Sequence, residues 1–157
     1  MTYRGVDISE WQDVYSYELL AQEVDFVIIR GGFGYSTIDK EFDKNVNGCI
    51  KNKIPYGVYW FSYALNEESA RNEADFLCSL LDKYAVKPSY PVFFDWEYDS
   101  MNFARKNGAA PNKAKITEMN EAFCERMTKL GHIAGYYLNN DYKKNYIDIS
   151  KLKKYRK

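Results

Sequence analysis

The chain has 157 residues, 46% of them hydrophobic, and its 22 basic and 22 acidic residues cancel. This length can bury one core, so we expect residues 1–157 to form a single domain. Because the chain has no net charge, its composition favours neither nucleic acid nor a membrane surface as a partner. No apolar stretch is as long as a membrane span, and the sequence does not open with a signal peptide.

Aromatic residues make up 17% of the chain, and Tyr is the most common of them. Such rings can fill a core, or they can line a cleft, where Tyr offers both an apolar face and a hydroxyl group. Cys49, Cys78 and Cys124 are odd in number and widely spaced. This pattern predicts small buried apolar groups rather than a disulfide framework.

Short apolar segments rich in β-branched and aromatic residues recur along the chain, and they predict buried strands. In chain order they are 3–9, 25–32, 56–64, 91–97 and 132–139. Helical spacing appears between the later segments. One helix is expected after Asn66, a candidate N-cap, and a second is expected to end before Gly131. Their apolar positions are Ala70, Ala74, Leu77, Leu81 and Tyr84, and Ile116, Met119, Phe123, Met127 and Leu130.

Alternating strands and helices favour a parallel sheet joined by crossovers, which is a doubly wound sheet or a (β/α) barrel. The first strand is followed by "GVDISEWQD" and not by a Gly-rich phosphate fingerprint, which favours the barrel. Five strands are too few for a closed eight-stranded barrel. We therefore predict an α/β fold, a modified TIM-like barrel that is incomplete in this chain, with open edges through which copies could self-associate. Residues 102–115 predict a long polar loop beside the fourth strand.

The segment "YPVFFDWEY", residues 90–98, places two acids at the end of an apolar strand. Side chains two apart on a strand point to the same side, so Asp95 and Glu97 should point together. Neighbouring carboxyl groups in a cleft disfavour each other's charge, so we expect one to hold a proton. A protonated acid beside an ionised one is the pair that glycosidases use. Asp7, at the end of the first strand, adds a third acid or caps the following turn.

Other side chains offer partners for these acids. Aromatic residues near the ends of the third and fifth strands could contact the apolar faces of sugars, and these are Tyr59, Phe61, Tyr63 and Tyr137. Each ring taken singly is also compatible with a core role. Asp7, Asp95, Glu97 and Asp39 could instead bind Mg²⁺ or Ca²⁺, which take oxygen ligands. His132, the only histidine, is expected in the core or at a cap rather than in catalysis.

Five motifs in this order resemble the glycoside hydrolase family 25 lysozymes, which are N-acetylmuramidases. They are "GVDISEWQ", "DFVIIRGGFG" with "DKEFDKNV", "IPYGVYWFSYA", "SARNEADFL" and "YPVFFDWEY". The resemblance runs from residue 5 to about residue 148, and family members continue for several strands beyond the position of Lys157. The chain therefore resembles a family 25 catalytic domain that lacks its C-terminal part.

The resemblance implies cleavage of the β-1,4 bond between N-acetylmuramic acid and N-acetylglucosamine in peptidoglycan. Glu97 matches the general acid, Asp95 its partner carboxylate and Asp7 the first-strand acid of the same cleft. Asp95 would attack the sugar or steady an intermediate formed by the substrate's acetamido group. No cofactor or metal is expected, and the glycan strands of peptidoglycan are the expected partner. Action outside the cell or in the cell wall would follow secretion or release by a phage. The alternative is a truncated module of the same fold that binds peptidoglycan or self-associates without cutting.

Overall fold

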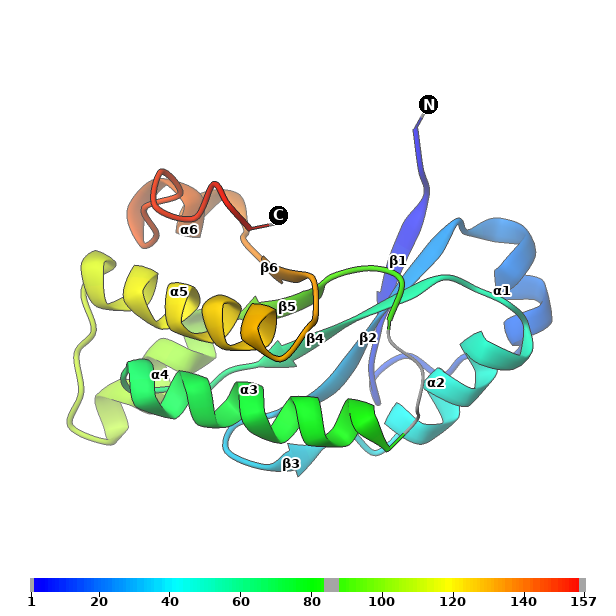
Figure 1. Ribbon diagram of the computed structural model, residues 1–157, viewed down its shortest axis with the longest axis horizontal. Helices are drawn as coiled ribbons and strands as arrows, with labels where there is room; N and C mark the ends of the chain where they lie inside the picture. Colours follow the sequence, from blue (N-terminus) through cyan, green and yellow to red (C-terminus); the bar gives the residue numbers. More distant parts are fainter. Residues whose placement is uncertain (1, 84–87, 156–157) are drawn as a thin grey trace.

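The computed structural model describes residues 2–83 and 88–155 (Figure 1). Its sheet contains five parallel strands in chain order: β1 (Gly5–Ile8), β2 (Phe26–Phe33), β4 (Tyr56–Phe61), β5 (Val92–Asp95) and β6 (Ala134–Tyr136). These confirm the five predicted strands. The sixth strand, β3 (Thr37–Ile38), pairs antiparallel with the end of β2. A two-residue strand is too short to show a period, so it could not be predicted from the sequence.

Five of the six described helices lie between strands, and the sixth follows β6. They are α1 (Tyr17–Glu23), α2 (Phe42–Lys51), α3 (Glu67–Asp82), α4 (Tyr98–Lys106), α5 (Lys113–Lys129) and α6 (Asn140–Asn145). The two predicted helices are confirmed as α3 and α5. The Asn66 side chain caps α3 by accepting a hydrogen bond from the Ser69 N–H at 2.9 Å, and Gly131 follows α5 with a φ of 87°. Tyr84, placed on the first of these helices, lies outside the described residues.

The predicted polar loop over 102–115 is wrong at both ends, because α4 continues to Lys106 and α5 begins at Lys113. Only residues 107–112 separate α4 from α5. Met101 and Ala104 are the buried apolar side chains of α4, too few to give a visible helical stripe among polar neighbours. The helix is instead started by the turn at Glu97.

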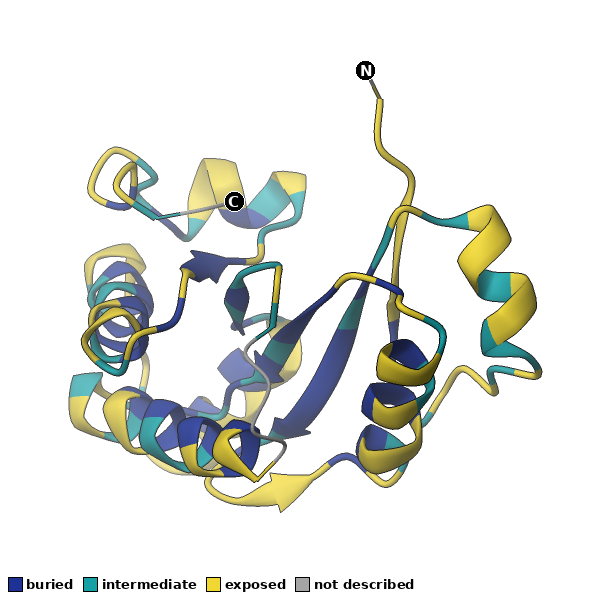
Figure 2. Cartoon of the chain, turned by 45° about the vertical axis from the view of Figure 1, so that its right-hand side comes forward, coloured by how far each residue is buried: buried dark blue, intermediate teal, exposed yellow. Residues whose placement is uncertain are grey.

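The two faces of the sheet differ in character because side chains alternate along each strand. One face packs against the helices and holds the apolar core, namely Val27, Ile29, Val58, Trp60, Val92 and Phe94, each at most 1% exposed. Figure 2 shows these buried strands at the centre, with helices around them that turn their exposed sides outward. The opposite face carries the intervening residues, and it forms the cleft described below.

The barrel is open. The strand order is sequential, as in a (β/α) barrel, but within the described residues β1 pairs only with β2, and β6 only with β5. Three of the four residues of β1 are exposed, and every residue of α1 is at least partly exposed. The predicted modified and incomplete barrel is therefore confirmed.

The remaining structural predictions concern the thiols and the histidine. Cys49, Cys78 and Cys124 are buried and form no disulfide bond with one another, as expected. His132 is 9% exposed, and its Nε2 lies 3.6 Å from Cys78 Sγ, consistent with a core role. Across residues 2–83 and 88–155, the structure contains no helix with the length and apolar character of a membrane span.

Candidate active site

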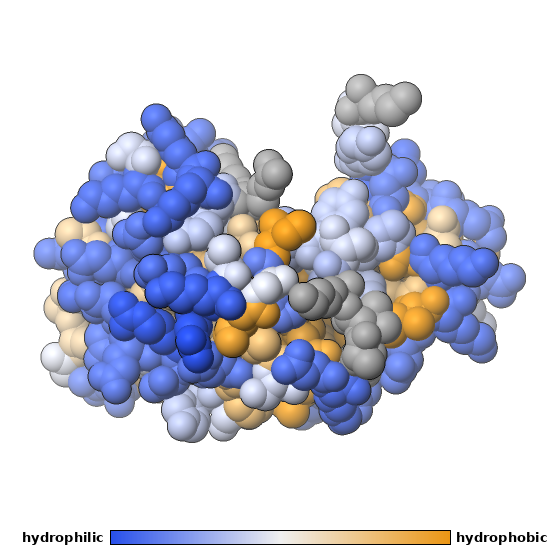
Figure 3. All heavy atoms as spheres, viewed as in Figure 1, coloured by the Kyte–Doolittle hydropathy of each residue, from blue (hydrophilic) through white to orange (hydrophobic). Residues whose placement is uncertain are grey.

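A cleft of about 1010 Å³ occupies the inner face of the sheet. Its walls come from all five parallel strands and from the segments that follow them, and they include Ile28, Phe93, Ile133 and Leu138. Figure 3 shows apolar residues gathered in the middle of one face of the molecule, between two strongly hydrophilic lobes. A volume of this size is large enough for an oligosaccharide or another extended ligand.

At one end of the cleft, the position of the Phe26 ring requires a glycine at position 5. The Phe26 ring stacks on Tyr90 with ring centroids 4.5 Å apart, and both residues line the cleft. A Cβ atom at Gly5 would lie only 2.2 Å from Phe26 Cζ. Any larger residue at position 5 would therefore displace the Phe26 ring, which explains the glycine in this exposed strand.

The three acids predicted from the sequence all line this cleft. Asp7 lies on β1, Asp95 is the last residue of β5, and Glu97 is the N-cap of α4. Asp95 is 6% exposed, Glu97 is half-buried and Asp7 is exposed. Asp7 does not cap the turn after β1, because Ser9 and Gln12 do so: Ser9 Oγ accepts from the Trp11 N–H, and Gln12 Oε1 accepts from the Ser9 N–H. The carboxyl group of Asp7 therefore remains available to the cleft.

Asp95 and Glu97 hold protons more tightly than isolated carboxyl groups do. Burial raises the pKa of Asp95 well above its usual range, the negative charges of Glu97 and Asp7 raise it further, and Arg30 opposes the rise. Burial also raises the pKa of Glu97, whereas a hydrogen bond from Asn139 at 3.5 Å lowers it. Asp95 Oδ1 is buried with no hydrogen-bond partner among the described residues. Both shifts favour the protonated form, which is the direction expected for one acid of the pair to hold a proton.

Arg30 is the positive group of the cleft. Its Nη2 lies 2.7 Å from Glu10 Oε1, and its Nε lies 2.6 Å from Asp39 Oδ2. Asp39 also accepts hydrogen bonds from the backbone N–H groups of Glu10 and Glu41. This buried network ties the loop after β1 to β2, so it holds the segment that follows Asp7.

A metal site formed by Asp7, Asp95, Glu97 and Asp39 is the alternative that the sequence left open. The carboxylate of Asp39 is occupied by Arg30 and by backbone N–H groups rather than facing the other three acids. Among residues 2–83 and 88–155, no three His, Cys, Asp or Glu side chains lie together as a metal-binding group. The acid cluster is thus arranged around a cleft with a single positive side chain, Arg30, among its lining residues.

Three of the four predicted aromatic residues line the cleft: Tyr59, Phe61 and Tyr137. Burial raises the pKa of both tyrosine hydroxyl groups, so they remain neutral hydrogen-bond donors. Tyr63 is not among the lining residues. It lies two residues beyond the end of β4, and its ring packs against Phe61 and Phe103, with centroid distances of 5.6 and 4.7 Å.

Trp11 is a cleft residue that the sequence reasoning missed. It lines the cleft and is 77% exposed, so its ring has few contacts within the protein. The exposed ring therefore leaves an apolar face available to a ligand in the cleft. The signal was its position in "DISEWQ", four residues after Asp7, in the loop that follows the first strand of a barrel.

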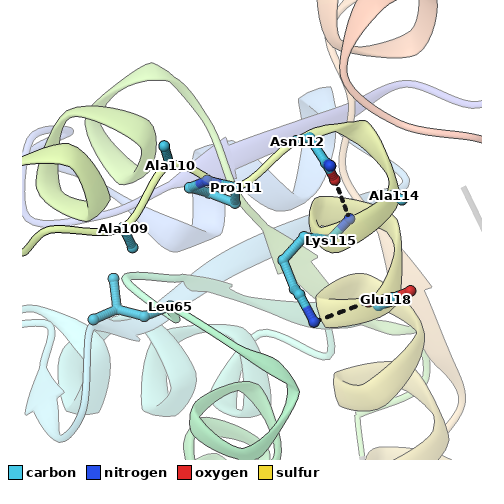
Figure 4. Close-up of a pocket in the computed structure, with 8 residues that line it drawn as sticks. All are labelled: Leu65, Ala109, Ala110, Pro111, Asn112, Ala114, Lys115 and Glu118. Carbon is cyan, nitrogen blue, oxygen red and sulfur yellow. Dashed lines mark hydrogen bonds and ion pairs between the residues drawn. The ribbon is translucent and has the colours of Figure 1, made fainter.

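A second hollow, of about 490 Å³, lies away from the acids (Figure 4). Leu65, residues 109–112 and the first turns of α5 form its walls. Its charged residues are already paired, since Lys115 Nζ lies 3.1 Å from both Glu67 and Glu118. We therefore place the candidate active site in the larger cleft.

Comparison with known proteins identifies the family to which the chain belongs. Residues 6–157 match the model of glycosyl hydrolases family 25, and the chain belongs to this family. No curated protein sequence matches the chain. The family assignment confirms the resemblance that the motifs predicted.

Solved structures agree with this assignment. The modular autolysin LytC from Streptococcus pneumoniae shares 29% identity with a TM-score of 0.78, and the match covers 92% of this chain and 34% of LytC. The catalytic domain of endolysin ply40, from bacteriophage P40 of Listeria monocytogenes, shares 26% identity with a TM-score of 0.75, covering 99% of this chain and 70% of that domain. A family GH25 lysozyme from Aspergillus fumigatus has the same fold at 20% identity and a TM-score of 0.63, covering 82% of this chain and 61% of that lysozyme. The chain thus spans about one third of LytC.

Proposed function

We propose that residues 1–157 act as one catalytic unit of a peptidoglycan hydrolase, a lysozyme that cleaves the β-1,4 bond between N-acetylmuramic acid and N-acetylglucosamine. The convergence of Asp7, Asp95 and Glu97 in one aromatic-lined cleft of a family 25 fold carries this proposal. LytC, an autolysin at 29% identity, has been solved in complex with a synthetic peptidoglycan ligand, which supports the same substrate class here.

In this proposal Glu97 is the general acid. It lies at the half-buried start of α4, where it can reach the oxygen that links two sugars and give it a proton. Asp95 and Asp7 supply negative charge to the sugar carbon, which becomes positive as the bond breaks. Tyr59, Phe61 and Tyr137 contact the sugar rings with their apolar faces, and the two tyrosine hydroxyl groups donate hydrogen bonds.

The proton must be on Glu97 when the bond breaks. In the free protein Asp95 is the more deeply buried acid and has two acidic neighbours, so it competes for the proton. A glycan strand in the cleft would remove water from half-buried Glu97 and raise its pKa further. Arg30 favours the ionised form of Asp95 at the same time. Substrate binding would therefore move the proton toward Glu97.

Loss of turbidity of a suspension of purified peptidoglycan tests the proposal. The wild-type protein should clear the suspension, and Glu97→Gln should lower the initial rate by at least about 100-fold, the usual contribution of a general acid. Glu68→Gln, which changes an exposed acid on α3, is the matched control and should lyse as the wild type does. Equal lysis by the wild type and Glu97→Gln would remove the catalytic role of Glu97.

A second candidate function rests on the open barrel. The free edges of β1 and β6 could bind glycan or a second copy without catalysis. This module would pellet with peptidoglycan but release no reducing ends, and light scattering after size-exclusion chromatography would show copies that associate.

Two of the similar structures, LytC and ply40, are an autolysin and a phage endolysin. Their similarity supports action of this chain in the cell wall, after secretion or release by a phage.

A further inference from the structure

The carboxyl group of Glu73 lies in the interior, outside the cleft. Glu73 belongs to α3 and is only 2% exposed, on the same buried stripe as Ala70 and Leu77. Its Oε1 accepts a hydrogen bond from the backbone N–H of Tyr63 at 3.0 Å. Its Oε2 is buried and has no hydrogen-bond partner among the described residues. A charged carboxylate in this place would be poorly solvated, so the neutral acid is favoured.

The segment that Glu73 holds is bonded to the acid-bearing strand. The backbone N–H of Ser62 donates to the carbonyl oxygen of Asp95 at 2.7 Å. Trp96 Nε1 donates to the carbonyl oxygen of Ala64 at 3.2 Å. Residues 62–64 therefore fix the backbone of Asp95 and the side chain of Trp96, the residue between the two acids.

The same segment supports one wall of the cleft. The Tyr63 ring packs edge-on against Phe61, which lines the cleft and lies opposite Asp95 in the β4–β5 register. Ser62 is fully buried, and its Oγ accepts a hydrogen bond from the Ala64 N–H at 3.0 Å, which closes the bend. A displacement of Tyr63 would therefore also displace Phe61 and Asp95.

The charge state of Glu73 depends on burial. Burial raises the pKa of Glu73 to about 8, whereas the Ser62 hydroxyl and the Tyr63 N–H lower it. Charged groups on the neighbouring elements have other partners: on α5, Lys115 pairs with Glu67 and Glu118, and Arg126 pairs with Asp75.

The negative charges of the acids near residues 62–64 change the pKa of groups other than Glu73. The negative charge of Asp99 on α4 raises the pKa of Glu97 and of Tyr63. The negative charges of Glu97 and Asp7 raise the pKa of Asp95. Glu73 is not among the causes of the raised pKa of Asp95 or Glu97. The structure connects Glu73 to the acid pair through the hydrogen bonds of residues 62–64.

We propose that Glu73 is a positioning residue for the acid pair: its neutral carboxyl group holds residues 62–64, and through them Asp95 and Trp96, in the geometry that aims Asp95 and Glu97 into the cleft. The activity part of this proposal rests on the proposed hydrolase function, whereas the geometric part does not. Ionisation of Glu73 would place a buried and poorly solvated charge beside the bend and loosen it.

Three variants test the role by kinetics. Glu73→Gln keeps a neutral acceptor for the Tyr63 N–H, Glu73→Ala removes it, and Glu68→Ala changes an exposed acid of the same helix. At neutral pH we expect Glu73→Ala to lower kcat about tenfold or more with KM changed less than about twofold, because misplaced catalytic groups reduce the rate more than binding. Glu73→Gln and Glu68→Ala should stay within about twofold of the wild type.

The pH dependence gives a second kinetic readout. Titration of Glu97 is common to the wild type and Glu73→Gln, so it cancels in the ratio of their kcat values. This ratio should rise in favour of Glu73→Gln above about pH 8, where wild-type Glu73 ionises. A ratio that stays constant across this pH range would overturn the proposal. This measurement does not use Glu73→Ala, so it decides the question even if that variant fails to fold.

Carboxyl carbon NMR gives a readout that needs no activity. Glu73→Ala should shift the titration midpoints of Asp95 and Glu97, and Glu73→Gln should leave them in place. If the wild type cuts no peptidoglycan and these shifts occur, the hydrolase function fails while the positioning role stands. A folded Glu73→Ala with unchanged midpoints would overturn the positioning role.

Discussion

The backbone N–H of Glu97 donates a hydrogen bond to Ser100 Oγ at 3.0 Å, in the first turn of α4. Ser100 is fully buried, so its hydroxyl group is held firmly by its surroundings. Strand β5 ends at Asp95 and α4 begins at Tyr98, so the chain changes from strand to helix between the two acids. This turn places Asp95 deep in the cleft and Glu97 nearer its rim.

Removal of this bond should loosen Glu97. Ser100→Ala leaves the Glu97 N–H without its partner, and we expect a loss of about 1 kcal/mol in the free energy of unfolding, the usual cost of a lost cap. The rate of peptidoglycan lysis should fall severalfold. Ser79→Ala removes the exposed hydroxyl of α3 that bonds to Asp75 and serves as the control for both measurements. A lysis rate unchanged by Ser100→Ala would show that this bond does not position Glu97.

The buried acid Asp95 should make the protein less stable as the pH rises. Its pKa is raised in the folded state, so the folded protein binds the proton more tightly than the unfolded chain does. The stability that this proton confers is complete below the unfolded pKa and is lost as the pH rises through the folded pKa, by about 1.4 kcal/mol per unit of pKa difference. In Asp95→Asn, the free energy of unfolding should decrease less as the pH rises.

Urea unfolding between acid and neutral pH measures the effect, and Asp82→Asn, at an exposed position on α3, is the control. Glu97 and Glu73 contribute falls of the same sign, so only the difference between the wild type and Asp95→Asn isolates Asp95. Parallel stability curves for the two proteins would mean that the pKa of Asp95 is the same in the folded and unfolded states, which would contradict its raised pKa.

The exposed ring of Trp11 should matter for binding and not for folding. Because Trp11 is 77% exposed, Trp11→Ala should change the free energy of unfolding by less than about 0.5 kcal/mol. Loss of a ring that stacks on sugar should raise KM for soluble peptidoglycan fragments about tenfold, which corresponds to about 1.4 kcal/mol. Tyr35→Ala is the control, because Tyr35 is 75% exposed and is not among the cleft residues. Equal KM values for the two variants would remove Trp11 from the binding surface.

The pair between Arg30 and Asp39 should be a large contributor to stability. Asp39→Ala leaves Arg30 with only Glu10 as a partner in a buried place, and we expect a cost of about 3–5 kcal/mol. The exposed pair between Arg4 and Glu23 is the matched comparison, and Glu23→Ala should cost less than about 1 kcal/mol. Chemical denaturation measures both variants, and similar costs would contradict the structural role of the Arg30 network.

The part of the site that lies on strands could be predicted from the sequence. Alternation along β5 places Phe93 and Asp95 on one side, and both line the cleft. Glu97 lies two residues beyond β5, and it lines the cleft from the turn that starts α4. The same rule failed for Tyr63 because β4 ends at Phe61, and the following bend turns Tyr63 toward Phe103. Strand periodicity holds only while the strand continues, and the sequence did not mark where β4 ends.

Glu73 was also missed, although a signal was present. It lies three residues after Ala70 and four before Leu77, which places it on the buried stripe of α3. An acidic residue at an apolar position indicates a buried carboxyl group with a specific partner. The partner itself, the Tyr63 N–H, depends on the bend after β4 and could not be read from the sequence.

Chemical identification of the products tests the central claim, cleavage of glycan by Glu97 with Asp95, most directly. Purified peptidoglycan is digested, its new reducing ends are reduced with borohydride, and the sugar alcohols are identified by mass spectrometry. The wild type should release fragments that end in the alcohol of N-acetylmuramic acid, and Glu97→Gln should release almost none. Equal release by both proteins, or no new reducing ends from the wild type, would contradict the account.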